Sequence, residues 1–511
     1  MASSDRTPDL DVLIIGAGLS GIDAAAAVLR DHPGKSVAIL ERREGLGGTW
    51  DLFKYPGIRS DSDMFTFAFK WRPWTSDKTL ADGPLIKEYL ATVAAETGVD
   101  QVIRYGHQVT KAEWDSTTEL WTVTTKAGGR TTKLTARFLW SCSGYYNYDE
   151  GFQPRFPGVE DYEGTFIHPQ FWPEDLDYAG KKVVIIGSGA TAVTLVPAMA
   201  NAGAASVTML QRTPTYIVSR PGNDLLAGGL AKVPFGRALT AMLPLKSLRH
   251  KSAYEAIRWE NLGLSLGLYL FAQRAPRLVK KFIRDNQISQ LTARGDGPGF
   301  TRAEAVAFVD DHLTPPYNPW DQRLCAVPDG DLWKAIREGS ATIVTDHIKT
   351  FTAKGIELES GETLEADVVV SATGLNIQLF GGAELTVDGE VVDPSETTAY
   401  RGTLLTRLPN FALTIGYINA SWTLKADLVS SWVSGLIGDM EKHGHTVVRV
   451  EEPDAAGSRP LMDMKSGYLL RGAPSMPKQG EGAYEAKQNY FVDMKRLAPG
   501  DYHDDGHLVF G

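Results

Sequence analysis

Two regions of the chain share a pattern in which an apolar run ends directly at a loop of small residues. In the first region the apolar run covers residues 12–15, the loop begins at Gly16, and an alanine-rich stretch covers residues 24–29. A continuous apolar run is typical of a parallel strand that helices cover on both faces, and the alanine-rich stretch predicts a helix. The run and the loop recur at residues 183–189. The pattern therefore predicts two strand, loop and helix units of an α/β protein.

The first loop has the spacing of a dinucleotide-binding turn. Gly16, Gly18 and Gly21 form G-x-G-x-x-G. Glycine allows the tight turn and the close approach of backbone to a pyrophosphate, and the helix N-terminus offers amide donors to it. Glu41 follows Gly21 by twenty positions, where a carboxylate can accept hydrogen bonds from ribose hydroxyls. This unit predicts a site for a dinucleotide with a free ribose, and a purely structural turn is the alternative.

The second loop has a different chemistry at the corresponding positions. Gly187, Gly189 and Ala192 form G-x-G-x-x-A, which the dinucleotide fingerprint tolerates. In place of the acidic residue stand Gln211 and Arg212, and a guanidinium suits a ribose 2′-phosphate. An ordinary surface charge is the alternative for Arg212. Two sites of opposite acidity predict FAD and NADPH as cofactors, with hydride transfer from nicotinamide to flavin.

Composition limits the classes of protein to consider. A chain of 511 residues with 43% hydrophobic and 22% charged residues predicts two or more globular domains. The net charge of -10 argues against nucleic-acid binding. Cys142 and Cys325 lack the spacing of metal ligands, so we expect no metal site and a reduced, cytoplasmic protein. The start of the chain lacks a signal-peptide pattern, and the longest apolar stretch, residues 262–272, is too short to span a membrane.

The order of these patterns predicts a fold of two Rossmann-like dinucleotide-binding domains with a helical insertion. We expect the FAD-binding domain to comprise residues 1–150 and 375–511. The NADP-binding domain is expected to comprise residues 151–222 and 309–374, and the helical insertion residues 223–308. The expected fold class is therefore α/β.

A segment between the two loops resembles the fingerprint of the Baeyer–Villiger monooxygenases, F-x-G-x-x-x-H-x-x-x-W-P/D. Gly164, His168, Trp172 and Pro173 occupy its fixed positions, and Tyr162 replaces the first aromatic residue. The related flavin-containing and N-hydroxylating monooxygenases usually carry Tyr or Phe where Trp172 stands. The chain thus resembles the Baeyer–Villiger branch more than its neighbours.

Further segments extend this resemblance along the chain from residue 11 to residue 490. Gly48 and Trp50 belong to a G-G-x-W segment, and Asp61 ends a Y-P-G-x-R-x-D segment. Arg323 occupies the place of the family's active-site arginine, in a version of that segment most similar to the ethionamide-activating branch.

The resemblance implies an FAD- and NADPH-dependent monooxygenase that inserts one oxygen atom from O2 into a small hydrophobic ketone through a C4a-peroxyflavin, giving an ester or lactone. Arg323 would stabilise the anionic oxygen species as the main catalytic residue, and Asp61 would orient it. The alternatives are a structural ion pair for Arg323 and a remote surface ion pair for Asp61. His168 is expected to make a structural hydrogen bond in the linker between the domains, and a direct role in proton transfer is the alternative. Trp172 is expected to pack at the domain junction and to help couple cofactor movement to oxygen activation.

Other functions remain open from the residues alone. Sulfide S-oxygenation or N-oxygenation could use the same flavin chemistry. A flavin disulfide reductase would need a close cysteine pair, which Cys142 and Cys325 do not form in the sequence. A redox-sensing flavoprotein is the non-catalytic alternative. Phe411 and Trp422 could either line a pocket or belong to the core.

The predicted helical insertion carries an excess of positive charge. Residues 246–284 contain nine Lys or Arg and two acidic residues. A basic, partly amphipathic helical patch could make weak contact with an anionic membrane surface. A solvated face or an oligomer contact is the alternative, and the pattern predicts no particular oligomeric state.

Overall fold

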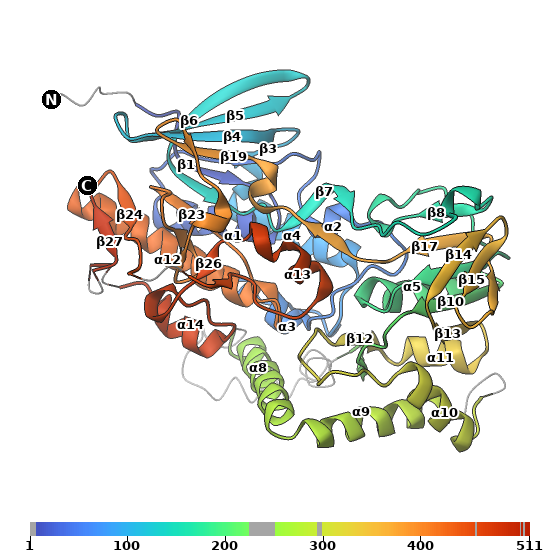
Figure 1. The fold of residues 1–511 in the computed structure, drawn as a ribbon. Coiled ribbons are helices and arrows are strands. Elements are labelled where there is room, and N and C mark those ends of the chain that lie inside the picture. Colours follow the sequence, from blue (N-terminus) through green and yellow to red (C-terminus); the bar gives the residue numbers. More distant parts are fainter. Residues whose placement is uncertain (1–6, 224–250, 294–298, 455–456, 501, 504–505) are drawn as a thin grey trace.

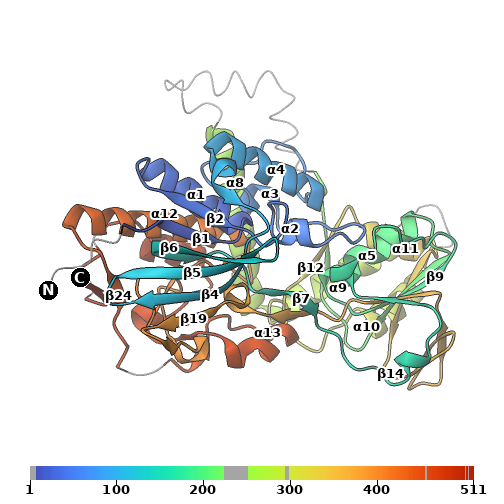
Figure 2. The same ribbon diagram turned by 90° about the horizontal axis from the view of Figure 1, so that it is seen from above.

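The computed structural model describes residues 7–223, 251–293, 299–454, 457–500, 502–503 and 506–511. Two sheets lie side by side, and the carboxyl end of the chain lies at the outer end of the larger one (Figures 1 and 2). The described fold is α/β, as the sequence pattern predicts.

The larger sheet has eleven strands in the described residues, and β1 lies near its centre, paired in parallel with β2 on one side and β6 on the other. Every residue of β2 is buried, because helices and further strands cover this part of the sheet. The strands are β1 (Leu10–Ile15), β2 (Val37–Leu40), β3 (Ile103–Arg104), β4 (Gln108–Asp115), β5 (Leu120–Ala127), β6 (Arg130–Ser141), β19 (Glu384–Val387), β20 (Glu390–Val391), β21 (Ala399–Tyr400), β22 (Leu404–Leu405) and β23 (Phe411–Leu413).

This sheet is assembled from two distant parts of the chain. β19 pairs in parallel with β4, and β23 pairs in parallel with β6, where Ala412 lies beside Trp140. The chain leaves the sheet through β7 (Tyr146–Gly151) and returns through β18 (Leu375–Ile377), and these two segments pair with each other.

The smaller sheet is parallel throughout and has the strand order β13-β10-β9-β17-β8. Its strands are β8 (Thr165–Ile167), β9 (Lys182–Ile186), β10 (Ser206–Gln211), β13 (Ala341–Thr345) and β17 (Val368–Ser371). The two sheets thus each contain one of the predicted strand and loop units.

Helices and small sheets complete the two halves. The longer helices are α1 (Leu19–Asp31), α4 (Gly83–Thr97), α5 (Ala190–Asn201), α8 (Lys251–Arg274), α9 (Pro276–Leu291), α10 (Arg302–His312) and α12 (Trp422–His443). The shorter ones are α2 (Thr49–Leu52), α3 (Met64–Phe67), α11 (Asp331–Arg337), α13 (Gly467–Gly472) and α14 (Tyr490–Arg496). The remaining strands are β11 (Ile217–Arg220), β12 (Cys325–Pro328), β14 (Ile348–Thr352), β15 (Gly355–Leu358), β16 (Thr363–Glu365), β24 (Val448–Val450), β25 (Arg459–Pro460), β26 (Lys478–Gln479) and β27 (Leu508–Phe510).

The predicted helical insertion is only partly described. Residues 224–250 lie outside the described residues, and with them two of the basic residues counted in the sequence, Lys246 and Arg249. The described part is helical in α8, α9 and α10. None of the described helices is long and apolar enough to cross a bilayer.

Candidate active site

A cavity of about 300 Å³ lies where the carboxyl ends of β1 and β2 face the first residues of α5. Such crevices beyond the carboxyl ends of parallel strands are the usual ligand sites of open α/β sheets. Seven of the residues predicted from the sequence line it: Gly16, Gly18, Glu41, Gly48, Trp50, Asp61 and Arg323.

Backbone geometry explains the glycines of the first loop. Gly16 has a φ of +98°, which L side chains rarely adopt. A Cβ on Gly21 would lie 1.8 Å from the carbonyl oxygen of Gly16, so this position of α1 admits no side chain. A Cβ on Gly48 would lie 3.0 Å from the Cα of Gly18, so two glycine segments approach each other at the cavity wall. The resulting bare backbone fits a pyrophosphate, which needs amide donors and no side chains in its way.

Glu41 is held in place by backbone amides. Its Oε2 accepts a hydrogen bond of 2.8 Å from the amide of Ala17, and its Oε1 accepts one of 2.8 Å from the amide of Arg43. Burial raises the pKa of Glu41 above its ordinary value, although these two hydrogen bonds oppose the shift. Each carboxylate oxygen keeps a further lone pair. The carboxylate can therefore still accept a ribose hydroxyl from the cavity side.

Arg323 and Asp61 come from segments far apart in the chain and line the same cavity. Arg323 lines the cavity and keeps solvent-exposed surface. Burial works against its charge, but the Asp61 carboxylate and nearby tyrosines raise the pKa of Arg323 above its ordinary value. Burial also raises the pKa of Asp61, while the guanidinium groups of Arg323, Arg59 and Arg220 oppose that shift. The site thus combines a permanent cation with a carboxyl group whose pKa is raised by burial.

Arg59 is a further cationic residue of the cavity wall that the sequence analysis did not single out. Its Nη1 donates to Asp331 Oδ2 at 2.7 Å. Its Nε and Nη2 are buried and have no hydrogen-bond partner among the described residues. Buried donors without a partner are costly, and a bound anion or carbonyl group would satisfy them. Its position two residues before Asp61 was the available signal.

Aromatic residues form another part of the cavity wall. Tyr145 stacks on Trp422 with a centroid distance of 5.4 Å and on Tyr468 with one of 6.3 Å. The hydroxyls of Tyr145 and Tyr146 lie 3.2 Å apart, and burial raises the pKa of Tyr146 to about 12. Tyr145 and Tyr146 were missed by the sequence analysis. Both follow the end of β6, and that position was the available signal.

The two aromatic residues left open by the sequence take different positions. Trp422 lines the cavity, and its Nε1 donates to Ser20 Oγ at 2.8 Å. Phe411 is 1% exposed and packs in the core of the larger sheet. The pocket interpretation therefore holds for Trp422, and the core interpretation holds for Phe411.

The second glycine loop approaches the cavity through its helix. Gly187 has a φ of +131°, and a Cβ there would lie 2.4 Å from the Ala372 carbonyl oxygen. Gly189 is the N-cap of α5, whose residues Ala190 and Thr191 line the cavity, and Ala192 is fully buried. The loop thus offers bare backbone at a helix N-terminus beside the first site.

Arg212 lies at the end of β10 with an exposed side chain. It makes no ion pair with any residue in the described part of the chain. An unpaired guanidinium there is available to a 2′-phosphate, and it is equally compatible with a surface charge. The geometry leaves both interpretations of Arg212 in place.

The fingerprint residues lie outside the cavity, and His168 lies at the junction between the sheets. The His168 Nδ1 accepts a hydrogen bond of 3.2 Å from the Gln170 amide, and its Nε2 lies 3.1 Å from the Gly374 carbonyl oxygen. One neutral tautomer satisfies both contacts, and burial lowers the pKa of His168. The ring also fills the space beside Gly151, so it ties together the two crossings between the sheets.

The other three fingerprint positions have structural surroundings. A Cβ on Gly164 would lie 2.3 Å from the Tyr162 hydroxyl oxygen, so glycine leaves room for that ring. Trp172 packs against the core of the smaller sheet, and Pro173 follows it with a partly buried side chain. None of these residues lines the cavity.

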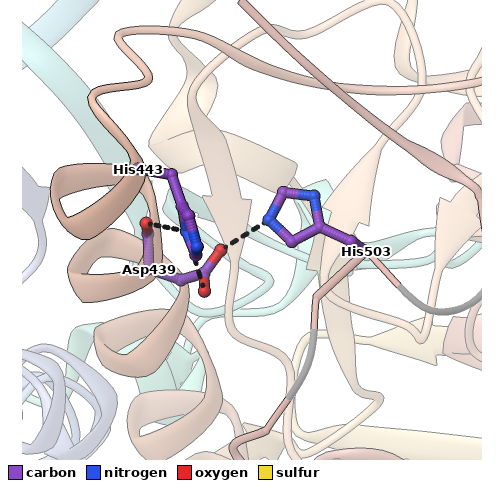
Figure 3. Close-up of side chains that lie close together, drawn as sticks. All are labelled: Asp439, His443 and His503. Atoms are coloured by element: carbon purple, nitrogen blue, oxygen red, sulfur yellow. Dashed lines mark hydrogen bonds and ion pairs between the residues drawn. The ribbon is translucent and has the colours of Figure 1, made fainter.

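One group among the described residues could supply three metal ligands (Figure 3), and none of its residues lines the cavity. His503 Nε2 lies 3.0 Å from Asp439 Oδ2, and His443 Nδ1 lies 3.4 Å from Asp439 Oδ1. Both histidines are exposed, and each carboxylate oxygen already has an imidazole partner. Ion pairing at the end of α12 accounts for the cluster.

Two family models match the amino-terminal half of the chain. A flavin-binding monooxygenase-like model matches residues 76–251, and an NAD(P)-binding Rossmann-like domain model matches residues 14–77. The second match covers most of the first glycine unit.

Nearly full-length relatives share almost half of the residues. The chain is 49% identical over 502 residues to the FAD-containing monooxygenase EthA of Mycobacterium tuberculosis, covering 98% of this chain and 97% of the relative. It is 46% identical over 505 residues to the probable FAD-binding monooxygenase AlmA of an Acinetobacter species, covering 98% and 96%.

Solved structures share the fold at lower identity. A steroid monooxygenase bound to NADP superposes with a TM-score of 0.72 at 21% identity, covering 98% of this chain and 99% of that one. Cyclohexanone monooxygenase in an open form superposes with a TM-score of 0.68 at 24% identity, covering 87% and 90%. The structure of OTEMO in complex with FAD and NADP gives a TM-score of 0.67 at 21% identity, covering 87% and 88%. These likenesses establish the Rossmann-like architecture of the two halves.

Proposed function

Because this chain belongs to the class B flavin monooxygenases, the family of the FAD-containing monooxygenase EthA, we propose that it is a Baeyer–Villiger enzyme that converts hydrophobic ketones to esters or lactones. It is an FAD-containing monooxygenase, so O2 and an organic compound are its substrates. The observation that carries the finer proposal is that Arg323 and Asp61 line one cavity and interact electrostatically there.

FAD and NADPH are the cofactors, and the two glycine loops fit them. Gly16, Gly18 and Gly48 would hold the FAD pyrophosphate against bare backbone, and Glu41 would accept its ribose hydroxyls. Gly187 and the N-terminus of α5 would hold the NADPH pyrophosphate, and Arg212 would bind its 2′-phosphate. Bound FAD, once reduced by NADPH, supplies the activated oxygen.

Arg323 provides the positive charge that this chemistry needs. Oxygen insertion into a ketone proceeds through negative charge that develops on the carbonyl oxygen. A guanidinium that the protein already holds in the cavity wall stabilises such charge without prior rearrangement. Its pKa lies above the ordinary value, so Arg323 keeps its proton throughout the working pH range.

Asp61 acts as a positioning residue for that cation. Its carboxylate raises the pKa of Arg323 through space, and no direct ion pair joins the two groups. Arg323 therefore retains hydrogen-bond donors for a substrate. Arg59, with two buried donors free, would help to fix a carbonyl or amide group beside Asp61.

The aromatic wall favours hydrophobic substrates. Tyr145, Tyr146 and Trp422 line the same cavity as the charged residues, and the two tyrosines lie close enough to Arg323 to affect its pKa. An apolar ketone can bury its hydrocarbon part there while its carbonyl faces Arg323. A sulfide fits the same wall, but its sulfur attacks an electrophilic, neutral oxygen donor, which a nearby cation does not favour. Sulfide S-oxygenation and N-oxygenation are therefore the secondary candidate activities.

Oxygen-isotope labelling tests this proposal. The FAD-loaded protein is given NADPH, ¹⁸O2 and matched ketones, sulfides and amines, and products are identified by mass spectrometry. We expect esters or lactones that carry one ¹⁸O atom. Sulfoxides or N-oxides without any ester would overturn the Baeyer–Villiger proposal in favour of the secondary activities.

A pair of variants at position 323 tests the role of the cation. Arg323→Ala should lower ester formation by about 100-fold or more, because removal of one preorganised charge-stabilising donor costs about 3–4 kcal/mol. Arg323→Lys keeps the charge and should retain measurable activity. Reduction of bound FAD by NADPH and FAD content serve as controls for folding. Full ester formation by Arg323→Ala would remove Arg323 from this role.

A further inference from the structure

Exposed large apolar side chains are concentrated on one helical segment. Eleven large hydrophobic residues are exposed among the described residues, and six of them lie between residues 264 and 282. These six are Leu264, Leu268, Leu270, Phe271, Leu278 and Phe282. Exposed apolar clusters of this kind mark surfaces that bind a protein or a membrane. We call this surface the α8–α9 face.

Positive charges surround the same residues. Between residues 261 and 284 the chain has five Lys or Arg and no acidic residue, although the protein as a whole carries a net charge of -10. Arg284 is paired with Asp310 at 2.7 Å. The other four are Arg274, Arg277, Lys280 and Lys281, and none of them makes an ion pair with a described residue. Cations that remain available to an anionic partner are therefore interspersed along the chain with the exposed apolar residues.

The helices that carry this face are firmly attached on their opposite sides. On α8, Arg258 donates to the carbonyl oxygen of Ala68 at 2.6 Å and pairs with Asp427 at 3.3 Å. On α9, the Gln287 Nε2 donates to the carbonyl oxygen of Ile217 at 3.1 Å. The two helices lie at the outer edge of the molecule and extend from beneath the larger half toward the smaller one (Figure 1). The apolar side chains therefore point away from a fixed base.

We propose that the α8–α9 face docks on a membrane surface that contains anionic lipids. Apolar side chains on a fixed helix pair, with a rim of Lys and Arg, suit the boundary between lipid headgroups and acyl chains. Neither helix can span the bilayer, so both would lie in the plane of the interface.

A second copy of the chain suits this face less well. A two-fold dimer would place the same patch on both subunits, so Arg274, Arg277, Lys280 and Lys281 of both copies would share one interface. Like charges without counter-ions oppose such a contact. Anionic headgroups neutralise these charges, so charge complementarity favours the membrane.

The face also lies on the outside of the segment that carries Arg323. Ala272, Val279 and Ile283 are buried in one cluster against Tyr216, and Leu324 packs on that cluster. A hydrophobic substrate that partitions into the bilayer would be concentrated on this side of the cavity. The proposal concerns binding and holds whichever compound the enzyme oxidises.

Vesicle flotation of the FAD-loaded, full-length protein measures the interaction. The protein is mixed with phosphatidylcholine vesicles that either contain or lack about 30 mol % phosphatidylglycerol, at low salt. We expect the protein to float with the anionic vesicles and to remain largely unbound with the neutral ones. Salt at about 0.5 M should weaken binding, because it screens the charges. No flotation with anionic vesicles overturns the proposal.

Matched variants show which residues are responsible. Arg277→Glu with Lys281→Glu should lower the partition coefficient by about tenfold or more. Lys126→Glu with Arg130→Glu reverses the same number of exposed charges on the hairpin of β5 and β6, at the opposite edge in Figure 1, and should change binding little. An equal loss in both pairs would show that only net charge matters and would overturn the proposed face.

A second pair of double variants tests the apolar residues of the α8–α9 face. Phe271→Gln with Phe282→Gln should also weaken flotation, whereas Val391→Gln with Leu470→Gln removes two exposed apolar residues elsewhere and should not. Retained FAD shows that each variant is folded. Sedimentation analysis tests whether a second copy of the chain occupies the face instead. A wild-type oligomer that the Phe271 and Phe282 changes dissociate, with vesicle binding unaffected, would assign the face to a second copy and overturn the membrane proposal.

Discussion

At the scale of single residues, the carboxyl group of Asp61 has the most testable electrostatics. Burial raises its pKa above 3.8 despite three nearby guanidinium groups. A raised pKa means that the folded protein loses the carboxylate at a higher pH than an exposed aspartate does, as pH falls. The neutral acid cannot support the charge of Arg323. The ionisation of Asp61 therefore belongs to the acid side of the pH profile.

We expect product formation to fall on the acid side with an apparent pKa above 3.8, and Asp61→Asn to lack this limb and show a low, pH-independent rate. The measurement is the rate of oxygen incorporation from acid to neutral pH, with bound FAD monitored at each pH. The raised pKa also means that Asp61 favours folding at low pH and that this contribution is lost as pH rises. An unchanged acid limb in Asp61→Asn would assign the limb to another group.

Arg212 is tested by coenzyme preference. Its exposed, unpaired guanidinium should bind the 2′-phosphate, and a charge-assisted hydrogen bond contributes about 1.5–3 kcal/mol. Arg212→Ala should therefore raise the KM for NADPH by about 10- to 100-fold and leave the KM for NADH nearly unchanged. Arg302→Ala, also exposed, is the matched control. Equal effects on both coenzymes would support the surface-charge interpretation.

The residues that could be predicted were those whose surroundings are local in sequence. Gly16, Gly18 and Glu41 follow buried strands at fixed spacings, and the cavity receives all three. Asp331 accepts a hydrogen bond from only one nitrogen of Arg59 and leaves the other two without a partner, and it lies 272 positions away in sequence. No local pattern indicates which nitrogen such a distant carboxylate satisfies. The glycines of the site could therefore be predicted from the sequence, whereas the contacts between its charged residues could not.

At the scale of elements, the turn into α1 explains a difference between the two loops. Gly21 faces the Gly16 carbonyl oxygen at a distance that excludes a methyl group, whereas Ala192 stands at the corresponding position of α5 with its side chain buried. The two strand, loop and helix units are thus similar in order and different in how closely the helix approaches the loop.

Gly21→Ala should open the first loop and lower FAD occupancy about tenfold or more, since overpacking typically costs about 1–3 kcal/mol. Ala192→Gly removes a methyl group without introducing a clash, and it should keep FAD occupancy near that of the wild type. The ratio of flavin to protein absorbance after purification measures both. Normal FAD loading of Gly21→Ala would show that the loop adapts.

Helix and strand identity could be predicted where apolar runs are long. Residues 12–15 and 183–186 lie within β1 and β9, as their continuous apolar pattern predicts. The pairing of β23 with β6 was not predictable, because Phe411–Leu413 is a three-residue strand whose partner lies more than 250 positions earlier. The aromatic wall depends on this pairing, since Trp422 follows it in the chain.

At the scale of the whole molecule, the segment after α2 connects the two halves. Leu52, Phe53 and Tyr55 are buried in the core cluster of the smaller sheet. Gly57 follows them with a φ of +75°, and a Cβ there would lie 2.8 Å from the Ala198 Cβ of α5. The position of the smaller sheet relative to the larger one therefore depends on a close backbone contact.

Gly57→Ala should push α5 away and slow the reduction of bound FAD by NADPH about tenfold, with FAD content unchanged, because overpacking of about 1–3 kcal/mol falls on the contact between the halves. Gly98 has a similar φ of +73° but open space around it, so Gly98→Ala isolates backbone strain from the clash. Anaerobic stopped-flow measurement of flavin reduction compares the two. Equal slowing in both variants would attribute the effect to strain alone.

The split origin of the larger sheet has a consequence for biosynthesis. The smaller sheet is complete once β17 has been made, at Ser371, while β4 and β6 still lack β19 and β23. A nascent chain on the ribosome must therefore carry unpaired strand edges past that point, and such edges attract wrong partners. Tyr417 and Trp422 of the cavity wall emerge later still. We therefore expect the nascent chain to capture flavin only in the last fifth of translation.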